Sequence, residues 1–242
     1  MIVLSVGMPR AGSGWHYNLI HELMRTAGSV DAREIRQQYR LQDILTEVNC
    51  NIGVLSARRL VRLMIPALQG KTFVIKAHSA PTIFSRSLRA LGLLCITYIY
   101  RDPRDAMLSA YDYGQRALDK GHPNAFSPLT DFHKSLDFML DYVKIWGMWM
   151  KESGVFKTRY EDLMLNYEAE SDRLVKFLKL ERDNPEVRRI IDDFRPGSTA
   201  GQQGLHFYKA EIGRFRKVYD SEQQRILQEK FGKYLSGMGY AL

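Results

Sequence analysis

The sequence of 242 residues predicts an α/β fold of three layers, in which a central parallel sheet of about four or five strands carries helices on both faces. Two observations lead to this prediction. Short apolar runs typical of buried strands alternate along the chain with longer segments typical of helices. In addition, a strand, a glycine-rich loop and a helix follow one another within the first 27 residues, which is how many nucleotide-binding α/β folds begin.

Four short apolar runs are predicted to form the strands, at residues 2–6, 72–76, 93–100 and 155–158. The predicted helices cover residues 15–27, most of 31–69, then 81–91, 103–118, 131–152, 161–180, 184–194 and 221–235. The fourth of these has a strong start signal, because Asp102 is a good N-cap and Pro103 suits the first helical position.

Two segments are predicted to be loops. Residues 120–130 hold one glycine and two prolines, and residues 195–216 hold four glycines. A connection as long as the second is often functional, so we expect a loop or lid there. Residues 1–242 show no repeat and no convincing linker, which predicts a single domain.

The bulk composition narrows the class of protein. Hydrophobic residues make up 45% of the chain, enough for a sizeable core, and the formal net charge of +8 suits an anionic partner. The basic residues are scattered, so no nucleic-acid partner is expected. The two cysteines form no metal or disulfide pattern. No signal peptide and no apolar run of about 20 residues is present, so we expect a cytoplasmic protein without a membrane span.

The first loop has the glycine spacing of a phosphate-binding loop. Gly7 and Gly12 enclose four residues, and a helix follows, so backbone N–H groups and the helix dipole both favour an anion. An ATP site would continue with Lys and Ser/Thr, but Ser13 and Gly14 stand there, and the only cation is Arg10 inside the loop. The loop therefore predicts a P-loop-like anion site without an obligatory metal. The alternative is that the glycines only make a tight turn.

Five segments, taken in order, resemble the PAPS-dependent sulfotransferases, in particular the soluble bacterial-type domain. The first loop resembles the donor loop PKSGTxW, with Arg10 in the Lys position. The other matching segments are KxH at 76–78, RNPxDxxxSxY at 101–111, a Trp-bearing helix followed by YEDL at 142–163, and the lid RKGxxGxWK at 209–216. The match runs from residue 2 to about residue 218, and the segment from Arg101 to Ser109 is its most specific part.

The resemblance implies transfer of a sulfuryl group from PAPS to an acceptor hydroxyl or amine of a small molecule or glycan, with release of PAP and no metal. His78 is then the general base, since a neutral imidazole accepts a proton near neutral pH. Arg10 and Lys76 would stabilise the charge on the leaving phosphate. Each also has a simpler interpretation: His78 as a polar loop residue, Lys76 as a solvated strand end.

The resemblance also implies the contacts to the donor. Arg101 and Ser109 would bind its 3′-phosphate; the alternative for Arg101 is a helix-start ion pair with Asp105. Trp15 would face the adenine, whereas Phe194 fits stacking and core equally well. The full predicted set is Arg10, Ala11, Gly12, Ser13, Gly14, Trp15, Arg101, Ser109, Tyr160, Phe194, Lys209, Gly213 and Arg216.

Some assignments stay open at this point. Ala210 replaces the first lid glycine, so Arg214 or Lys217 could take the place of Arg216. Tyr111, Tyr113 and residues 120–130 would line the acceptor pocket or form core and surface. Two other functions remain: a P-loop kinase of a nucleotide or small metabolite, and a non-catalytic protein that binds PAP or nucleic acid. The acceptor and the oligomeric state are not predicted.

Overall fold

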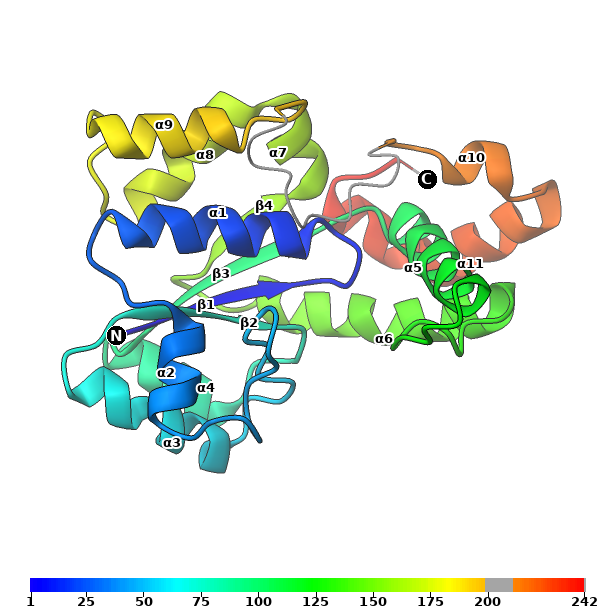
Figure 1. Ribbon diagram of the computed structural model, residues 1–242. Helices are drawn as coiled ribbons and strands as arrows, with labels where there is room; N and C mark the ends of the chain where they lie inside the picture. Colours follow the sequence, from blue (N-terminus) through cyan, green and yellow to red (C-terminus); the bar gives the residue numbers. More distant parts are fainter. Residues whose placement is uncertain (199–210, 242) are drawn as a thin grey trace.

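The computed structural model describes residues 1–198 and 211–241 (Figure 1). Its centre is a parallel sheet in the order β2-β1-β3-β4, formed by β1 (Ile2–Gly7), β2 (Phe73–Ala77), β3 (Leu94–Tyr100) and β4 (Phe156–Arg159). β1 therefore lies between β2 and β3, and the chain changes direction there. In open parallel sheets the crevice at such a switch point, beyond the carboxyl ends of the strands, is the usual place for a ligand.

Helices cover both faces of the sheet, as Figure 1 shows with one group of helices above the strands and another below them. One face carries α1 (Ser13–Arg25), α7 (Tyr160–Leu165), α8 (Tyr167–Phe177) and α9 (Pro185–Asp193). The other face carries α3 (Ala57–Leu68), α4 (Ile83–Ala90), α6 (Phe132–Met150) and α11 (Ser221–Met238), with α2 (Ala32–Gln38) beside β2. The prediction of a three-layer α/β fold is confirmed.

The strand residues divide between two cores because side chains alternate across a strand. Ile2 and Leu4 belong to the core under α6 and α11, and Val3 between them belongs to the core under α1 and α8. This burial on both sides fixes the register of the sheet. The carboxyl ends of β1, β2 and β3 consequently meet at one edge.

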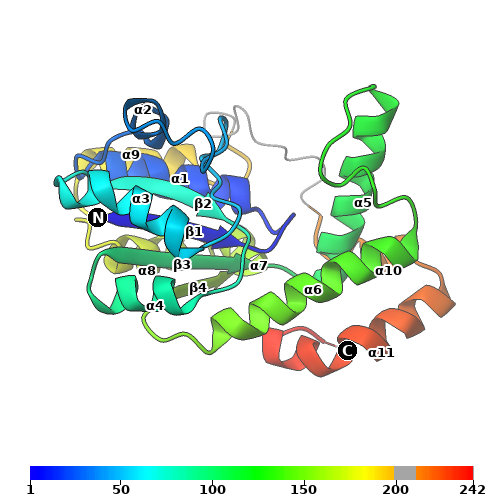
Figure 2. The ribbon, with the colours of Figure 1, turned by 90° about the horizontal axis from the view of Figure 1, so that it is seen from below.

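Beyond that edge, α5 (Pro103–Asp119) and the short α10 (Phe215–Val218) project away from the body of the molecule (Figures 1 and 2). The predicted start of α5 is confirmed, since the Asp102 side chain accepts a hydrogen bond from the backbone N–H of Arg104 at 3.0 Å and Pro103 opens the helix. Within the described residues, no helix is long and apolar enough to cross a membrane.

The prediction of mainly helical structure over residues 31–69 was wrong for residues 39–56, which join α2 to α3 without a helix. Three residues there take positive φ, namely Arg40, Cys50 and Gly53. The segment pairs instead with β2: Ile52 donates to the carbonyl of Lys76 at 2.9 Å, and Lys76 donates to the carbonyl of Cys50 at 3.2 Å. These backbone bonds to a distant strand override the local helical pattern.

Candidate active site

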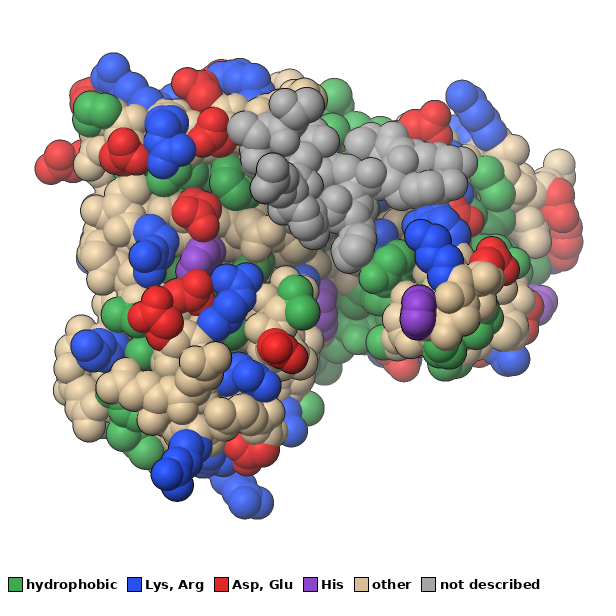
Figure 3. All heavy atoms as spheres, in the orientation of Figure 1, with side chains coloured by type: hydrophobic (Ala, Val, Ile, Leu, Met, Phe, Trp, Pro, Cys, Tyr) green, Lys and Arg blue, Asp and Glu red, His purple; other side chains and the backbone are tan. Residues whose placement is uncertain are grey.

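A cavity of about 430 Å³ lies at the carboxyl edge of the sheet, between the body of the molecule and the projection around α5. The space-filling view is hollowed there (Figure 3). The described residues that line it include most of the predicted site: Arg10, Gly12, Ser13, Gly14, Trp15, Lys76, His78, Arg101, Ser109 and Tyr160. Four separate segments of the chain therefore bring their predicted residues to one place. Ala11, in the same loop, is fully buried beneath it.

The first loop brings its backbone close to the cavity because its glycines allow it. Gly12 has φ 73°, and a Cβ added there would lie 2.7 Å from Cδ2 of Tyr160. A Cβ at Gly7 would lie 2.6 Å from Cβ of Ser13. No side chain in the described part of the chain caps the start of α1, so the N–H groups of its first turn are left for an anion. The interpretation of the glycines as a turn alone does not explain this uncapped helix end beside a cavity.

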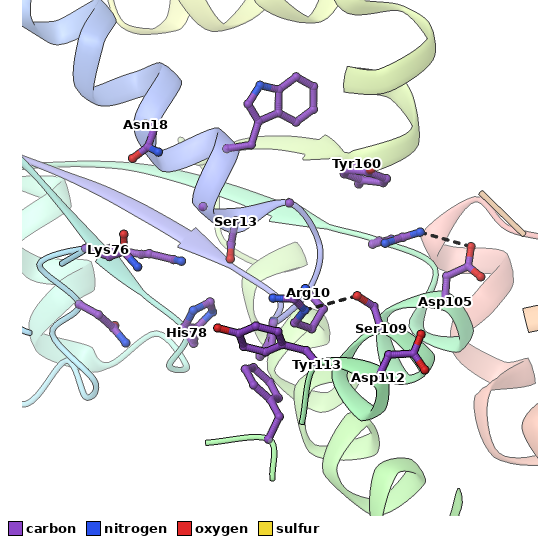
Figure 4. A pocket seen from close by; sticks show the side chains of 18 of the residues that line it. Arg10, Ser13, Asn18, Lys76, His78, Asp105, Ser109, Asp112, Tyr113 and Tyr160 are labelled. Carbon is purple, nitrogen blue, oxygen red and sulfur yellow. Dashed lines mark hydrogen bonds and ion pairs between the residues drawn. The ribbon is translucent and has the colours of Figure 1, made fainter. Parts of the chain in front are cut away.

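His78 follows β2 directly, and its ring is fixed by the first loop. Its Nδ1–H donates to the carbonyl oxygen of Gly7 at 2.6 Å, since a carbonyl can only accept. Nε2 therefore carries the lone pair of the neutral ring. Burial, and then the nearby ammonium of Lys76, lower the pKa of His78 to about 4. The ring is neutral at physiological pH, and in Figure 4 it lies next to the hydroxyl of Tyr113.

Lys76 and Arg10 are cations held in a buried place. Burial lowers the pKa of Lys76 to about 8, with a further contribution from Arg10. Burial also lowers the pKa of Arg10 to about 10. The guanidinium of Arg10 lies 4.3 Å from the ring centre of Tyr113, and its Nε donates to Oγ of Ser109 at 3.3 Å (Figure 4). Arg10 thus reaches from the first loop towards α5.

Arg101, just after the end of β3, is buried, and only some of the hydrogen-bond donors of its guanidinium have a partner among the described residues. Its guanidinium lies 4.5 Å from the ring centre of Tyr160, its Nη2 donates to the carbonyl of Glu211 at 2.6 Å, and it stands 3.7 Å from Asp105. Its Nε is buried and has no hydrogen-bond partner among the residues that the structure describes. The ion pair with Asp105 is present, but it leaves donors of the guanidinium unused. An unpaired buried donor is costly, which suggests that a ligand completes this site.

The aromatic end of the cavity is built from Trp15 and Tyr160, whose rings meet edge to face with centres 6.4 Å apart. Trp15 stacks on Tyr167 behind it at 6.0 Å, and its Nε1 donates to the carbonyl of Phe194 at 3.0 Å. The ring of Phe194 packs against the core under α1 and does not line the described part of the cavity. Phe194 therefore orients Trp15 through its backbone.

The segment before α10 is tied to α5 by one carboxylate. Asp105 accepts from the backbone N–H of Gly213 at 2.6 Å and of Phe215 at 3.0 Å. Of the lid cations, Arg214 lines the cavity and pairs with Asp112, whereas Arg216 is exposed and lies over the ring of Phe215. Lys209 lies outside the described residues.

Sequence reasoning missed part of the cavity wall. Tyr113 and Phe126 line the cavity, which agrees with the interpretation of this region as part of the pocket wall. Tyr111 is not among the described residues that line it. The residues that were not anticipated are Asn18, Thr46, Val48, Asn49, Asn51 and Arg116. The closely spaced asparagines and the glycine after them were a signal against a helix at residues 49–53. In the described part of the chain, no three His, Cys, Asp or Glu side chains converge as metal ligands.

The fold, with this cavity at the carboxyl edge of its sheet, defines a nucleotide-binding α/β protein. The sequence model of the sulfotransferase domain matches residues 2–239, so the chain belongs to the sulfotransferase domain family and is an enzyme that transfers a sulfuryl group.

Known structures share the fold at low sequence identity. Mouse sulfotransferase SULT7A1 complexed with PAP superposes with a TM-score of 0.66 at 17% identity, over 98% of this chain and 85% of that one. Retinol dehydratase in complex with androsterone and the inactive cofactor PAP gives 0.58 at 18% identity, over 97% and 80%. Sulfotransferase STF9 from Mycobacterium avium gives 0.53 at 13% identity, over 100% and 77%. Among curated proteins no significant match was found.

Proposed function

We propose that this protein, acting as one domain, transfers the sulfuryl group of PAPS to an acceptor hydroxyl or amine of a small molecule or glycan and releases PAP. The observation that carries the proposal is the pair of anion sites on either side of an aromatic end, the start of α1 and the Arg101–Ser109 pair. PAPS has phosphates on both sides of its ribose and an adenine ring, which matches this arrangement. The PAP complexes of SULT7A1 and retinol dehydratase support the same donor.

The residues present fit the donor. The uncapped first turn of α1 and the hydroxyl of Ser13 suit the phosphosulfate end, and the unpaired Nε of Arg101 suits the 3′-phosphate. Tyr160 and Trp15 offer ring edges and faces for adenine. Arg10 bonds to Ser109 in this structure, so its charge serves the 3′-phosphate side as well as the loop.

His78 is suited to take the proton of the acceptor, because it lines the cavity and the bond of Nδ1–H to Gly7 leaves the lone pair of the ring on Nε2. In the reaction, the acceptor O–H bond breaks and its proton goes to Nε2. The acceptor oxygen bonds to sulfur as the bond between sulfur and the phosphate oxygen breaks. Lys76 lies beside His78, and its ammonium would neutralise the charge left on the phosphate.

The competing functions fit less well. A P-loop kinase needs the Lys and Ser/Thr that Ser13 and Gly14 replace, and the family match is to sulfotransferases. A non-catalytic protein that binds PAP would keep the donor site and have no need of a fixed, neutral His78. Activity therefore separates the proposal from that alternative.

Two measurements test the proposal. Calorimetry should show binding of PAP and no comparable binding of ATP with magnesium; absence of PAP binding would overturn the donor assignment. Transfer from labelled PAPS to a panel of acceptors should fall roughly 10²–10⁴-fold in His78→Ala, with the affinity for PAP unchanged. The exposed His122→Ala is the matched control and should keep full activity. Undiminished turnover in His78→Ala would remove the base assignment.

A further inference from the structure

One wall of the cavity carries none of the residues that we assign to the donor. It consists of Asn18 on α1 and of Thr46, Asn49 and Asn51 from the segment between α2 and α3, and we call these four residues the amide wall. Asn51 of this wall is paired with Lys76, and in Figure 4 Asn18 and Lys76 lie on one side of the view and Ser109 on the other. In Figure 4, Asn18 projects from α1 above Lys76.

The amide wall is held in place by backbone pairing. Asn51 lies in register with Lys76, and the bonds between Ile52, Cys50 and Lys76 fasten this segment to the edge of β2. Within the segment, Asn51 donates its N–H to Oγ1 of Thr46 at 2.9 Å. The position of the wall relative to Lys76 is therefore set by the same strand that presents Lys76.

The amides of the wall have hydrogen-bonding capacity to spare. Among the described residues, the side chains of Asn18 and Asn49 make no hydrogen bond, although both are half-buried. Asn51 uses only its Oδ1, which accepts from the N–H of Gly53 at 3.2 Å. Each free amide offers two N–H donors, and those of Asn18 and Asn49 also offer an acceptor oxygen.

The charges around this space select against an ammonium group. The guanidinium of Arg10 is close enough to lower the pKa of Lys76, and an added cation would be repelled by both. Asp112, one of the acidic residues that line the cavity, is already paired with Arg214. The cavity is also lined by Tyr113 and Phe126, whose ring centres are 5.7 Å apart. An acceptor here meets neutral amides as well as aromatic rings.

We propose that the acceptor is an uncharged, polyhydroxylated molecule, a saccharide, whose ring hydroxyls are held by the amide wall while one hydroxyl faces His78. Neighbouring hydroxyls on a sugar each donate and accept, which is the pattern an amide satisfies, and the aromatic side suits the apolar face of a sugar ring. A phenol or aliphatic alcohol would leave the amides desolvated and unpaired, which a polar site rejects strongly. This inference rests on the proposed sulfuryl transfer.

The experiment compares acceptor classes and wall variants. Labelled PAPS is supplied with a panel of neutral mono- to tetrasaccharides, a panel of substituted phenols and aliphatic alcohols, and a panel of amines. Saccharides should be the preferred class by kcat/KM. In Asn49→Leu and Asn18→Leu, which replace an amide by an apolar side chain of similar size, the KM for the saccharide should rise roughly 10-fold or more, because each removes hydrogen bonds to the acceptor. Gln37→Leu, an exposed amide on α2, is the matched control and should leave KM unchanged.

The outcomes separate this inference from the function on which it rests. If PAP does not bind, the donor assignment fails and this inference fails with it. If PAP binds but phenols or amines are preferred, or no saccharide is sulfated, the acceptor class is wrong and the donor assignment stands. An unchanged saccharide KM in both wall variants, with PAP affinity intact, would likewise overturn the role of the amide wall.

Discussion

The rate of sulfuryl transfer should depend on the protonation of Lys76, whose pKa is set by its burial and by Arg10. Its ammonium is buried at the edge of β2 with the guanidinium of Arg10 nearby, and its pKa is lowered to about 8. About nine-tenths of Lys76 is then charged at pH 7 and about one-tenth at pH 9. If the charge of Lys76 is needed for the leaving phosphate, kcat/KM, which reports the free enzyme, should fall roughly tenfold per pH unit above pH 8. On the acid side, His78 should set a limb near pH 4.

The assay is kcat/KM from pH 4 to pH 10 for the wild type and for Lys76→Arg. Arginine stays charged over this range, so the variant should lose the limb near pH 8 whatever its absolute rate. Lys71→Arg, which changes an exposed lysine just before β2, should keep that limb. A limb near pH 8 that persists in Lys76→Arg would show that another group titrates there and would refute the role given to Lys76.

The pH dependence of stability against unfolding gives a second test of the lowered pKa of Lys76. The pKa of Lys76 is lower in the folded protein than its ordinary value of 10.5, so the unfolded chain binds more protons between about pH 8 and 10.5. The contribution of Lys76 to stability therefore rises with pH through that window, while activity falls. Lys76→Met, which never carries the buried charge, should be more stable than the wild type below pH 8, and the difference in melting temperature should shrink towards pH 10. A constant difference would contradict the lowered pKa.

Two further predictions concern the donor site. Arg101→Lys keeps the charge but loses the forked donors, so the affinity for PAP should fall roughly 10–100-fold, with little effect on the affinity for AMP, which lacks the 3′-phosphate. Calorimetry measures both affinities, and Arg104→Lys, at a residue outside the described cavity lining, should change neither. An equal loss of affinity for PAP and AMP would contradict a 3′-phosphate role. Gly12→Ala and Gly28→Ala both place a side chain at positive φ, 73° and 77°, and the backbone strain alone should cost about 1 kcal/mol of unfolding free energy in urea at each position. Only at Gly12 does the new methyl group meet Tyr160, so only Gly12→Ala should also weaken PAP binding; equal PAP affinity in both variants would count against the close approach of the loop.

The parts of the fold that the sequence predicts well have local causes. The apolar runs that became β1 to β4 are short, and turn or cap residues such as Gly7 and Asp102 bound them. Residues 39–56 were mispredicted because their structure depends on pairing with β2, more than 20 residues further along the chain. An apolar pair such as Ile44 and Leu45 can be buried in a helix or in an irregular segment, so apolar periodicity alone cannot distinguish these two conformations.

The difference between local causes and contacts with distant parts of the chain also applies to the site. The first loop and the Arg101–Ser109 segment carry their chemistry within a few residues, and both line the cavity. The amide wall could not be predicted, because nothing near Asn51 in the sequence indicates that it will pair with Lys76. Phe194 shows a third case: the residue is close to Trp15 as expected, but its carbonyl makes the contact and its ring packs in the core.

Arg10 links these observations, because it stands between the other cations of the cavity. Its pKa is lowered partly by Arg101, and it in turn lowers that of Lys76. A donor with phosphates at both ends of its ribose would bring negative charge to this row and relieve the repulsion along it. Binding of the donor should therefore raise the pKa of Lys76 again. The alkaline limb of kcat, which reports the enzyme with donor bound, should then lie above the limb of kcat/KM near pH 8. Coincident limbs would mean that the donor leaves the charge of Lys76 uncompensated and that its phosphates lie elsewhere.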